Sequence, residues 1–284
     1  KTINKDITSS ELGNILSNNL IDNKRIIFLS ENKIFNKKKI VKKNFLNEEI
    51  FFTEKILLKI NKKEKKIEIK QNQVDDWILF SNLNVDEWKF SFNGKLILND
   101  SKIYNRMNNQ GMTGCLNFYN VKFNNNNFDI ENGRCEDSLN IVNSYGKINK
   151  INISSAFSDA LDIDFSNLFI ENVSINDAGN DCVDFSGGNY EVKEFKLKNC
   201  VDKGVSVGEQ SIITIQKILV ENAKTGVASK DSSTVKLKYT YLKNLKTCLA
   251  AYNKKQEFYG GFINVENFDC KNYYQKTDID NYSE

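Results

Sequence analysis

A pattern that recurs every 22 residues constrains this chain more than any other feature of its sequence. The repeats start at Asp137, Asp159, Asp181, Lys203, Thr225 and Thr247, with the segments DSLNIVNS, DALDIDFS, DCVDFSGG, KGVSVGEQ, TGVASKDS and TCLAAYNK. In each segment the second residue is small, the third is aliphatic, the fourth is polar or small, and the fifth is mostly apolar. A fixed period of this length is typical of repeat proteins, in which each unit stacks on its neighbours.

The alternation within each repeat predicts β-strands. Apolar third and fifth residues enclose a polar or small fourth residue, so positions three and five should face inward and position four outward. A second apolar alternation follows, as at Ile148, Ile151 and Ile153, after Asn and Gly residues that mark turns. A unit this short has no room for a crossover helix. We therefore predict an all-β fold, a parallel β-helix (solenoid) with 22-residue coils.

The regularity of the pattern sets the predicted boundaries. The segment from Gly114 to Phe118 repeats the same order one coil earlier, so regular coils are expected over residues 114–272. Less regular strands upstream extend the predicted β-helix to residues 41–272. Residues 1–40 are expected to hold irregular first strands and a short capping helix near residues 9–19, after the capping box of Thr8 and Glu11. Residues 273–284 are interpreted as a C-terminal tail.

Composition excludes several functions. The chain contains no histidine, which excludes Ser-His-Asp and Cys-His catalysis and histidine-ligated zinc. Its 40 Lys and Arg residues nearly balance 37 Asp and Glu residues, which argues against a nucleic-acid partner. No long uncharged apolar run is present, so we expect a soluble chain without membrane insertion.

The six cysteines leave the redox compartment open. They include no C-x-x-C pair, so a cysteine zinc site or a thioredoxin-type motif has little support. They could form disulfides in an oxidising compartment, or remain buried thiols. We interpret Cys182, in the small second position, as a packing residue.

The first position of the repeat brings ionisable residues into one row. Stacked coils lie about 4.8 Å apart, so Asp137, Asp159, Asp181 and Lys203 should be successive neighbours; we call this row the ladder. Paired carboxylates at one or two strand spacings suit glycosidase chemistry, retaining or inverting. Lys203 should lower the pKa of Asp181, or could serve as a base if burial lowered its own pKa. We assign catalysis to Asp159, Asp181 and Lys203.

Carboxylates packed this closely should hold a proton or recruit a cation. Calcium is the expected cofactor, because Asp162, Asp164 and Asp184 on the same strands add hard oxygen ligands. The alternative is structural, since Asp and Asn side chains at coil corners commonly accept hydrogen bonds from backbone amides.

A mixed acidic and basic flank lies beside the ladder in the repeat pattern. Aromatic and charged side chains there could line a groove for an extended anionic polymer; each could equally be part of a solvated turn. The expected substrate-binding residues are Asp137, Asn180, Asp202, Glu209, Lys230, Tyr252 and Lys254.

Three consecutive segments resemble a known enzyme family. The runs FSDALDI (157–163), GNDCVDF (179–185) and DKGVSVG (202–208) are similar to the N-T-D, G-D-D and G-H-G motifs of polygalacturonases. The resemblance implies a right-handed parallel β-helix of the pectin-lyase-like superfamily, with Asp159 and Asp181 as water-activating carboxylates. Asn180 stands in place of the usual proton donor and Lys203 in place of the histidine, while the R-I-K motif has no counterpart. The chain also resembles uncharacterised bacterial β-helix repeat proteins.

Lyases and uronate epimerases of the same superfamily abstract the proton next to a carboxylate and do not need the missing donor. We therefore expect a protein that acts on a polysaccharide, lyase- or epimerase-like rather than a hydrolase, outside the cell, on its surface or in the periplasm. The alternative is a non-catalytic solenoid that binds carbohydrate or serves as an adhesive or structural module of a cell-surface or phage assembly.

Overall fold

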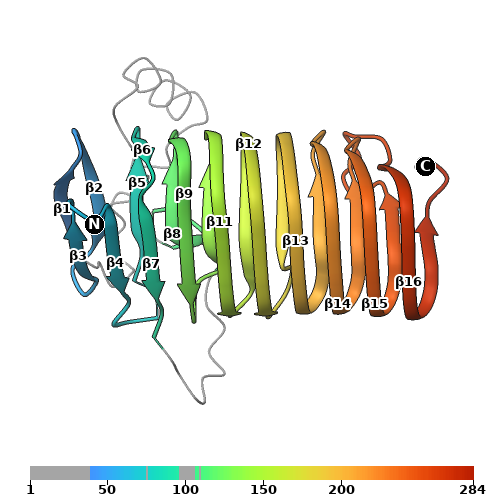
Figure 1. Ribbon diagram of the computed structural model, residues 1–284, viewed down its shortest axis with the longest axis horizontal. Coiled ribbons are helices and arrows are strands. Elements are labelled where there is room, and N and C mark those ends of the chain that lie inside the picture. The colour runs from blue at the N-terminus through green and yellow to red at the C-terminus, as the bar shows by residue number, and fades with distance from the viewer. Residues whose placement is uncertain (1–38, 75, 96–105, 109) are drawn as a thin grey trace, which may run out of the picture.

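The computed structural model describes residues 39–284 except residues 75, 96–105 and 109. These residues form an all-β solenoid of about 8 turns with about 23 residues per turn, and they contain no helix. Coils stack in one row in the order of the sequence (Figure 1). The helix predicted near residues 9–19 lies outside the described residues. Those residues also contain no helix with the length and apolarity that a membrane span requires.

The sixteen strands of the described residues form one continuous sheet that winds around the solenoid. They are β1 (Ile40–Phe45), β2 (Glu48–Thr53), β3 (Leu57–Asn61), β4 (Lys66–Lys70), β5 (Ile78–Ser81), β6 (Asn84–Asp86), β7 (Lys89–Asn93), β8 (Gly114–Tyr119), β9 (Lys122–Glu131), β10 (Asp137–Val142), β11 (Tyr145–Ala156), β12 (Asp159–Ala178), β13 (Val183–Gly208), β14 (Ile212–Lys230), β15 (Thr234–Tyr252) and β16 (Phe262–Ile279).

The register of the regular coils confirms the predicted stacking. β10 pairs in parallel with β8 and β12, and β12 to β16 pair in parallel in sequence order. Asp162 lies beside Asp184 and Ser206 beside Ala228, one repeat apart in each case. Columns of the sequence repeat are therefore rows of neighbours in the structure.

The N-terminal strands differ from the predicted irregular coils. β1 pairs antiparallel with β2, β2 with β5, and β3 with β4. The turns between β1 and β2 and between β3 and β4 are short, which lets successive strands pair as hairpins, whereas a parallel pair needs a long connection. At the other end, β16 extends to Ile279, so it includes part of the segment that we interpreted as a tail.

The inward positions form the hydrophobic core. Leu139, Leu161 and Val183 of position three are fully buried. Phenylalanines fill the interior of the first coils: Phe80 stacks on Phe118 with ring centroids 5.0 Å apart, and Phe90 stacks on Phe128 at 5.2 Å. Burial of such columns is the main stabilisation that one coil gains from the next.

Asparagines stack at one corner of the solenoid. Asn199, Asn222 and Asn244 have φ values of 58°, 61° and 57°, in the left-handed region that asparagine tolerates. The Asn222 amide donates to Oδ1 of Asn199 at 2.8 Å, and the Asn244 amide donates to Oδ1 of Asn222 at 3.0 Å. This row fixes the turn of each coil against the next.

All six cysteines are paired in disulfides, Cys115–Cys135, Cys182–Cys200 and Cys248–Cys270. Of the two alternatives left open for the cysteines, the structure shows disulfides, and Cys182 is fully buried within its pair. The paired cysteines are 20, 18 and 22 residues apart, so about one turn of the solenoid brings each pair together. The second disulfide joins the residue after Asp181 to the corner that precedes Lys203.

Candidate functional site

The coil register brings the ladder together as predicted. Asp137 and Asp159 are direct partners in neighbouring strands. The backbone N–H of Asp181 donates to Oδ1 of Asp159 at 2.8 Å, and the backbone N–H of Lys203 donates to Oδ1 of Asp181 at 2.9 Å. Asp137, Asp159 and Asp181 are only 2%, 8% and 4% exposed.

The same hydrogen bonds give the ladder a structural role. Each bond ties a carboxylate to the backbone of the following coil, and Oδ1 of Asp159 also accepts the Asn180 side-chain amide at 2.8 Å. Asn180 therefore holds a ladder residue in place. The structural alternative, in which corner carboxylates accept hydrogen bonds from backbone amides, therefore holds for Oδ1 of Asp159 and Oδ1 of Asp181.

Burial shifts the ladder carboxyls towards their protonated forms. It raises the pKa of Asp159 to about 6 and that of Asp181 to about 7, and it raises the pKa of Asp137 well above its usual range. Lys203 opposes the shift of Asp181, but the loss of solvation outweighs it. The net direction is the reverse of the one that we expected from the neighbouring amine alone.

Lys203 is a partly buried ammonium held by two carboxylates. Its Nζ lies 3.4 Å from Oδ1 of Asp181 and also contacts Oδ2 of Asp202. Burial alone would lower the pKa of Lys203, but the charges of Asp181 and Asp202 raise it above its ordinary value. Lys203 is therefore a permanent cation at neutral pH and does not meet the condition for a base.

The expected calcium ligands Asp162, Asp164 and Asp184 lie on the neighbouring strands β12 and β13. The amide of Asn140 donates to Oδ2 of Asp162 at 3.1 Å, and Asp162 is the strand partner of Asp184. Burial raises the pKa of Asp164 to about 6 and that of Asp162 well above its usual range. Within the described residues no group of three or more His, Cys, Asp or Glu side chains is arranged to hold a metal ion. Calcium binding by these residues therefore stays a prediction.

A buried lysine crosses the outward side of the coils. The Lys230 side chain is 7% exposed, and its Nζ lies 3.6 Å from Oδ1 of Asp184, two coils away. It passes over Gly208, where an added Cβ would come within 3.1 Å of the Lys230 Cε. Ser206, which occupies the same fourth position of the repeat as Asp184, is fully buried. Position four was expected to face solvent, but this part of the outward face is covered.

Of the other expected binding residues, Tyr252 lies near the ladder, whereas Glu209 and Lys254 have partners outside it. Burial raises the pKa of the Tyr252 hydroxyl, and the charges of Lys203 and Lys230 oppose this rise. Tyr252 therefore lies close enough to Lys203 to interact with the ladder. Glu209 is paired with Lys255. Lys254 is exposed, and its backbone N–H donates to Oδ1 of Asp231 at 2.8 Å. The burial of Asp231 and the ion pair between Asp184 and Lys230 were not predicted from the sequence. The long Lys230 side chain joins two coils that are not neighbours in the repeat.

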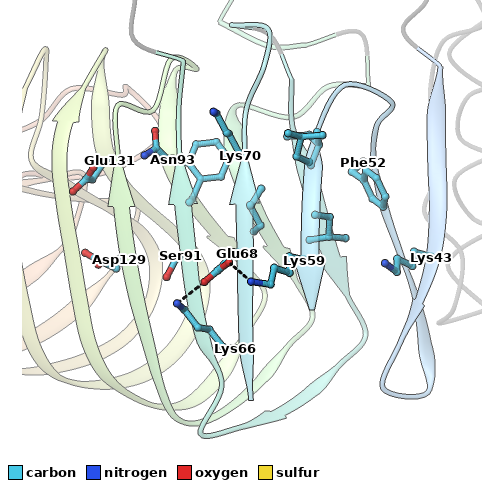
Figure 2. A pocket seen from close by; sticks show the side chains of 15 residues that line it. Lys43, Phe52, Lys59, Lys66, Glu68, Lys70, Ser91, Asn93, Asp129 and Glu131 are labelled. Carbon is cyan, nitrogen blue, oxygen red and sulfur yellow. Dashed lines mark hydrogen bonds and ion pairs between the residues drawn. The ribbon is translucent and has the colours of Figure 1, made fainter. Parts of the chain in front are cut away.

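A hollow lies at the N-terminal end of the solenoid, and its lining residues precede the ladder in the sequence. It is lined by strands β1 to β4, β7 and β9, and it contains the ion pairs of Glu68 with Lys59 and Lys66 (Figure 2). None of its lining residues belongs to the ladder. The sequence repeat gave no signal for it, because the hollow lies where the regular pattern is absent.

Comparison with known proteins assigns no family to the chain, so it is classified by its fold alone. No protein-family model, no curated protein and no solved structure matches the chain. The geometry therefore defines a β-solenoid with a buried acid–lysine ladder.

Proposed function

We propose that the ladder face acts on an extended anionic polysaccharide by lyase- or epimerase-like proton abstraction. The observation that carries the proposal is the Asp159–Asp181 pair, with pKa values of about 6 and about 7, beside an ammonium that stays charged. Near neutral pH such a pair supplies one carboxylate and one carboxylic acid, which are a general base and a general acid.

Each residue has a role in this proposal. The ionised carboxylate takes the proton from the carbon next to the substrate carboxylate, and Lys203 stabilises the negative charge that develops there. In a lyase the resulting electron pair forms a C=C bond as the glycosidic C–O bond breaks, and the neighbouring carboxylic acid protonates the leaving oxygen. In an epimerase a proton returns to the opposite face of the same carbon. The resemblance of residues 157–208 to polygalacturonase motifs adds support for a uronate substrate.

The disulfides support a place outside the reducing cytosol. Pairing of all six cysteines is typical of proteins that fold in oxidising compartments. We therefore propose an extracellular, cell-surface or periplasmic location, where polysaccharides are accessible.

The experiment is an assay on a panel of uronate polymers that records the absorbance of unsaturated products and, by NMR, exchange of the proton next to the carboxylate. The protein should act on at least one polymer, and Asp159→Asn and Asp181→Asn should each lower turnover at least 100-fold while circular dichroism stays unchanged. Asp129→Asn, at an exposed site on β9, is the matched control. Absence of both products on every polymer, or full activity in either ladder variant, would overturn the proposal.

The hydrogen bonds from Asp181 N and Lys203 N favour a second candidate, a non-catalytic solenoid that binds or displays carbohydrate. In that case the ladder only maintains the coil register. Asp181→Asn would then change the melting temperature, whereas polysaccharide binding measured by calorimetry would persist without turnover in the unsubstituted protein.

A further inference from the structure

A second surface of the solenoid has the form of a binding groove. It is a shallow hollow of about 500 Å³ that crosses five neighbouring strands, from Ser174 in β12 to Lys271 in β16. These strands lie side by side along the C-terminal half of the solenoid (Figure 1). The hollow therefore follows the solenoid axis, and none of its lining residues belongs to the ladder.

Exposed and half-buried apolar side chains lie in the groove and directly beside it. Tyr241 is 45% exposed and is the strand partner of the half-buried Leu219. Tyr239, two residues earlier, points to the same side of β15 and is 51% exposed. Neighbouring apolar side chains on an otherwise polar sheet face are typical of an interaction site.

Charges around these apolar side chains favour an anionic occupant. Four lysines line the groove against two acids, Glu221 and Asp269. Lys198 and Lys243 share Glu221, with N···O distances of 3.7 and 3.3 Å, and Lys271 lies 3.1 Å from Asp269. The lysine side chains are between 53% and 70% exposed; they are Lys196, Lys198, Lys243 and Lys271. Exposed ion pairs contribute little to stability, so carboxylates of a ligand can replace these partners.

We propose that this groove binds a uronate-containing polysaccharide chain laid along the solenoid axis. The Tyr241 ring stacks on the apolar face of a sugar, and lysines of β13, β15 and β16 pair with sugar carboxylates. Glu221 of β14 lies between Lys198 and Lys243, so these two lysines are two strand spacings apart, about 10 Å. Anchoring of the polymer here is a binding function separate from proton abstraction at the ladder. It shares the substrate class of the proposed function and none of its residues.

Calorimetry at low ionic strength tests this site with two probes, oligomers of polygalacturonate and of alginate. The host protein carries Asp159→Asn and Asp181→Asn, so that turnover does not interfere. We expect measurable binding of one probe. Tyr241→Ala and the double variant Lys198→Gln/Lys243→Gln should each weaken it at least fivefold. Tyr145→Ala, a similarly exposed tyrosine on β11 outside the groove, should leave the affinity unchanged.

Each other outcome counts against the groove. Binding of neither probe, or affinity unaffected by Tyr241→Ala, would overturn the proposal. Equal affinity for a DNA duplex would also overturn it, because the lysines would then act as an unspecific basic patch. If the ladder substitutions abolish binding that the unsubstituted protein shows, the polymer binds at the ladder and the groove proposal fails, while the proposed function stands.

Discussion

Oδ1 of Asp181 accepts the backbone N–H of Lys203 at 2.9 Å and lies 3.4 Å from the ammonium of the same lysine. One oxygen atom therefore joins two coils through a backbone hydrogen bond and also fixes a charge beside the acid pair. Structural and chemical roles meet in one residue. The residue that has this double role is a carboxyl only 4% exposed.

The raised pKa values predict a definite pH dependence of stability. Asp159 and Asp181 titrate near 3.8 when solvated but at about 6 and about 7 in the fold, so the folded state binds their protons more tightly. Their contribution is therefore favourable at low pH and is lost as pH rises from about 4 to about 7. Each pKa unit corresponds to about 1.4 kcal/mol. We expect a higher melting temperature at pH 5 than at pH 7.5.

Asp181→Asn tests the origin of this pH dependence. Asparagine keeps an oxygen for the Lys203 amide but cannot ionise, so the difference in melting temperature between pH 5 and pH 7.5 should shrink. Asp129→Asn should leave the difference unchanged, because that side chain is exposed. Greater stability of the unsubstituted protein at pH 7.5, or an unchanged difference in Asp181→Asn, would show that the ladder carboxyls are ionised in the fold.

The asparagine row should contribute measurably to stability. Asn222→Ala removes bonds to Asn199 and Asn244 and places alanine at a φ of 61°, so it should lower the free energy of unfolding by about 1–3 kcal/mol. Asn222→Gly loses the same hydrogen bonds but tolerates the backbone, so it should cost less than alanine. Urea unfolding measures both, and a glycine variant that is less stable than the alanine variant would contradict this account.

The Cys182–Cys200 disulfide should stabilise the coil that carries the ladder. Replacement of both cysteines by serine should lower the free energy of unfolding by about 2–4 kcal/mol, because the unfolded chain regains the freedom of the loop. Thermal melts with and without a reductant provide the measurement, and the oxidised protein should weigh six hydrogen atoms less than the fully reduced chain. An equal melting temperature under both conditions would contradict the prediction.

The sequence predicted the features that depend on local repetition. Asp137, Asp159, Asp181 and Lys203 lie in one row because strand pairing repeats with the period of the sequence. The hairpins of β1 to β4 were not predicted, since the repeat is absent there and pairing depends on short turns. The pKa of Asp181 also could not be predicted, because it depends on how completely neighbouring atoms exclude water.

Long side chains limit the interpretation of the repeat in a different way. The alignment of repeats compares neighbouring coils, whereas Lys230 reaches Asp184 across the intervening coil. The Cys115–Cys135 and Cys182–Cys200 pairs are separated by 20 and 18 residues, so they join different positions of the 22-residue repeat and an alignment by column does not bring them together. Both kinds of contact become visible only when the coil is closed in space.

The most direct test of the central claim is a carboxyl titration by carbon NMR of protein with labelled aspartate, with Asp159→Asn and Asp181→Asn used to assign the two signals. The account predicts midpoints near pH 6 for Asp159 and near pH 7 for Asp181, which would leave an acid and a base together at neutral pH. Midpoints of both groups near pH 4 would show two ionised carboxylates and contradict the proposed acid–base site.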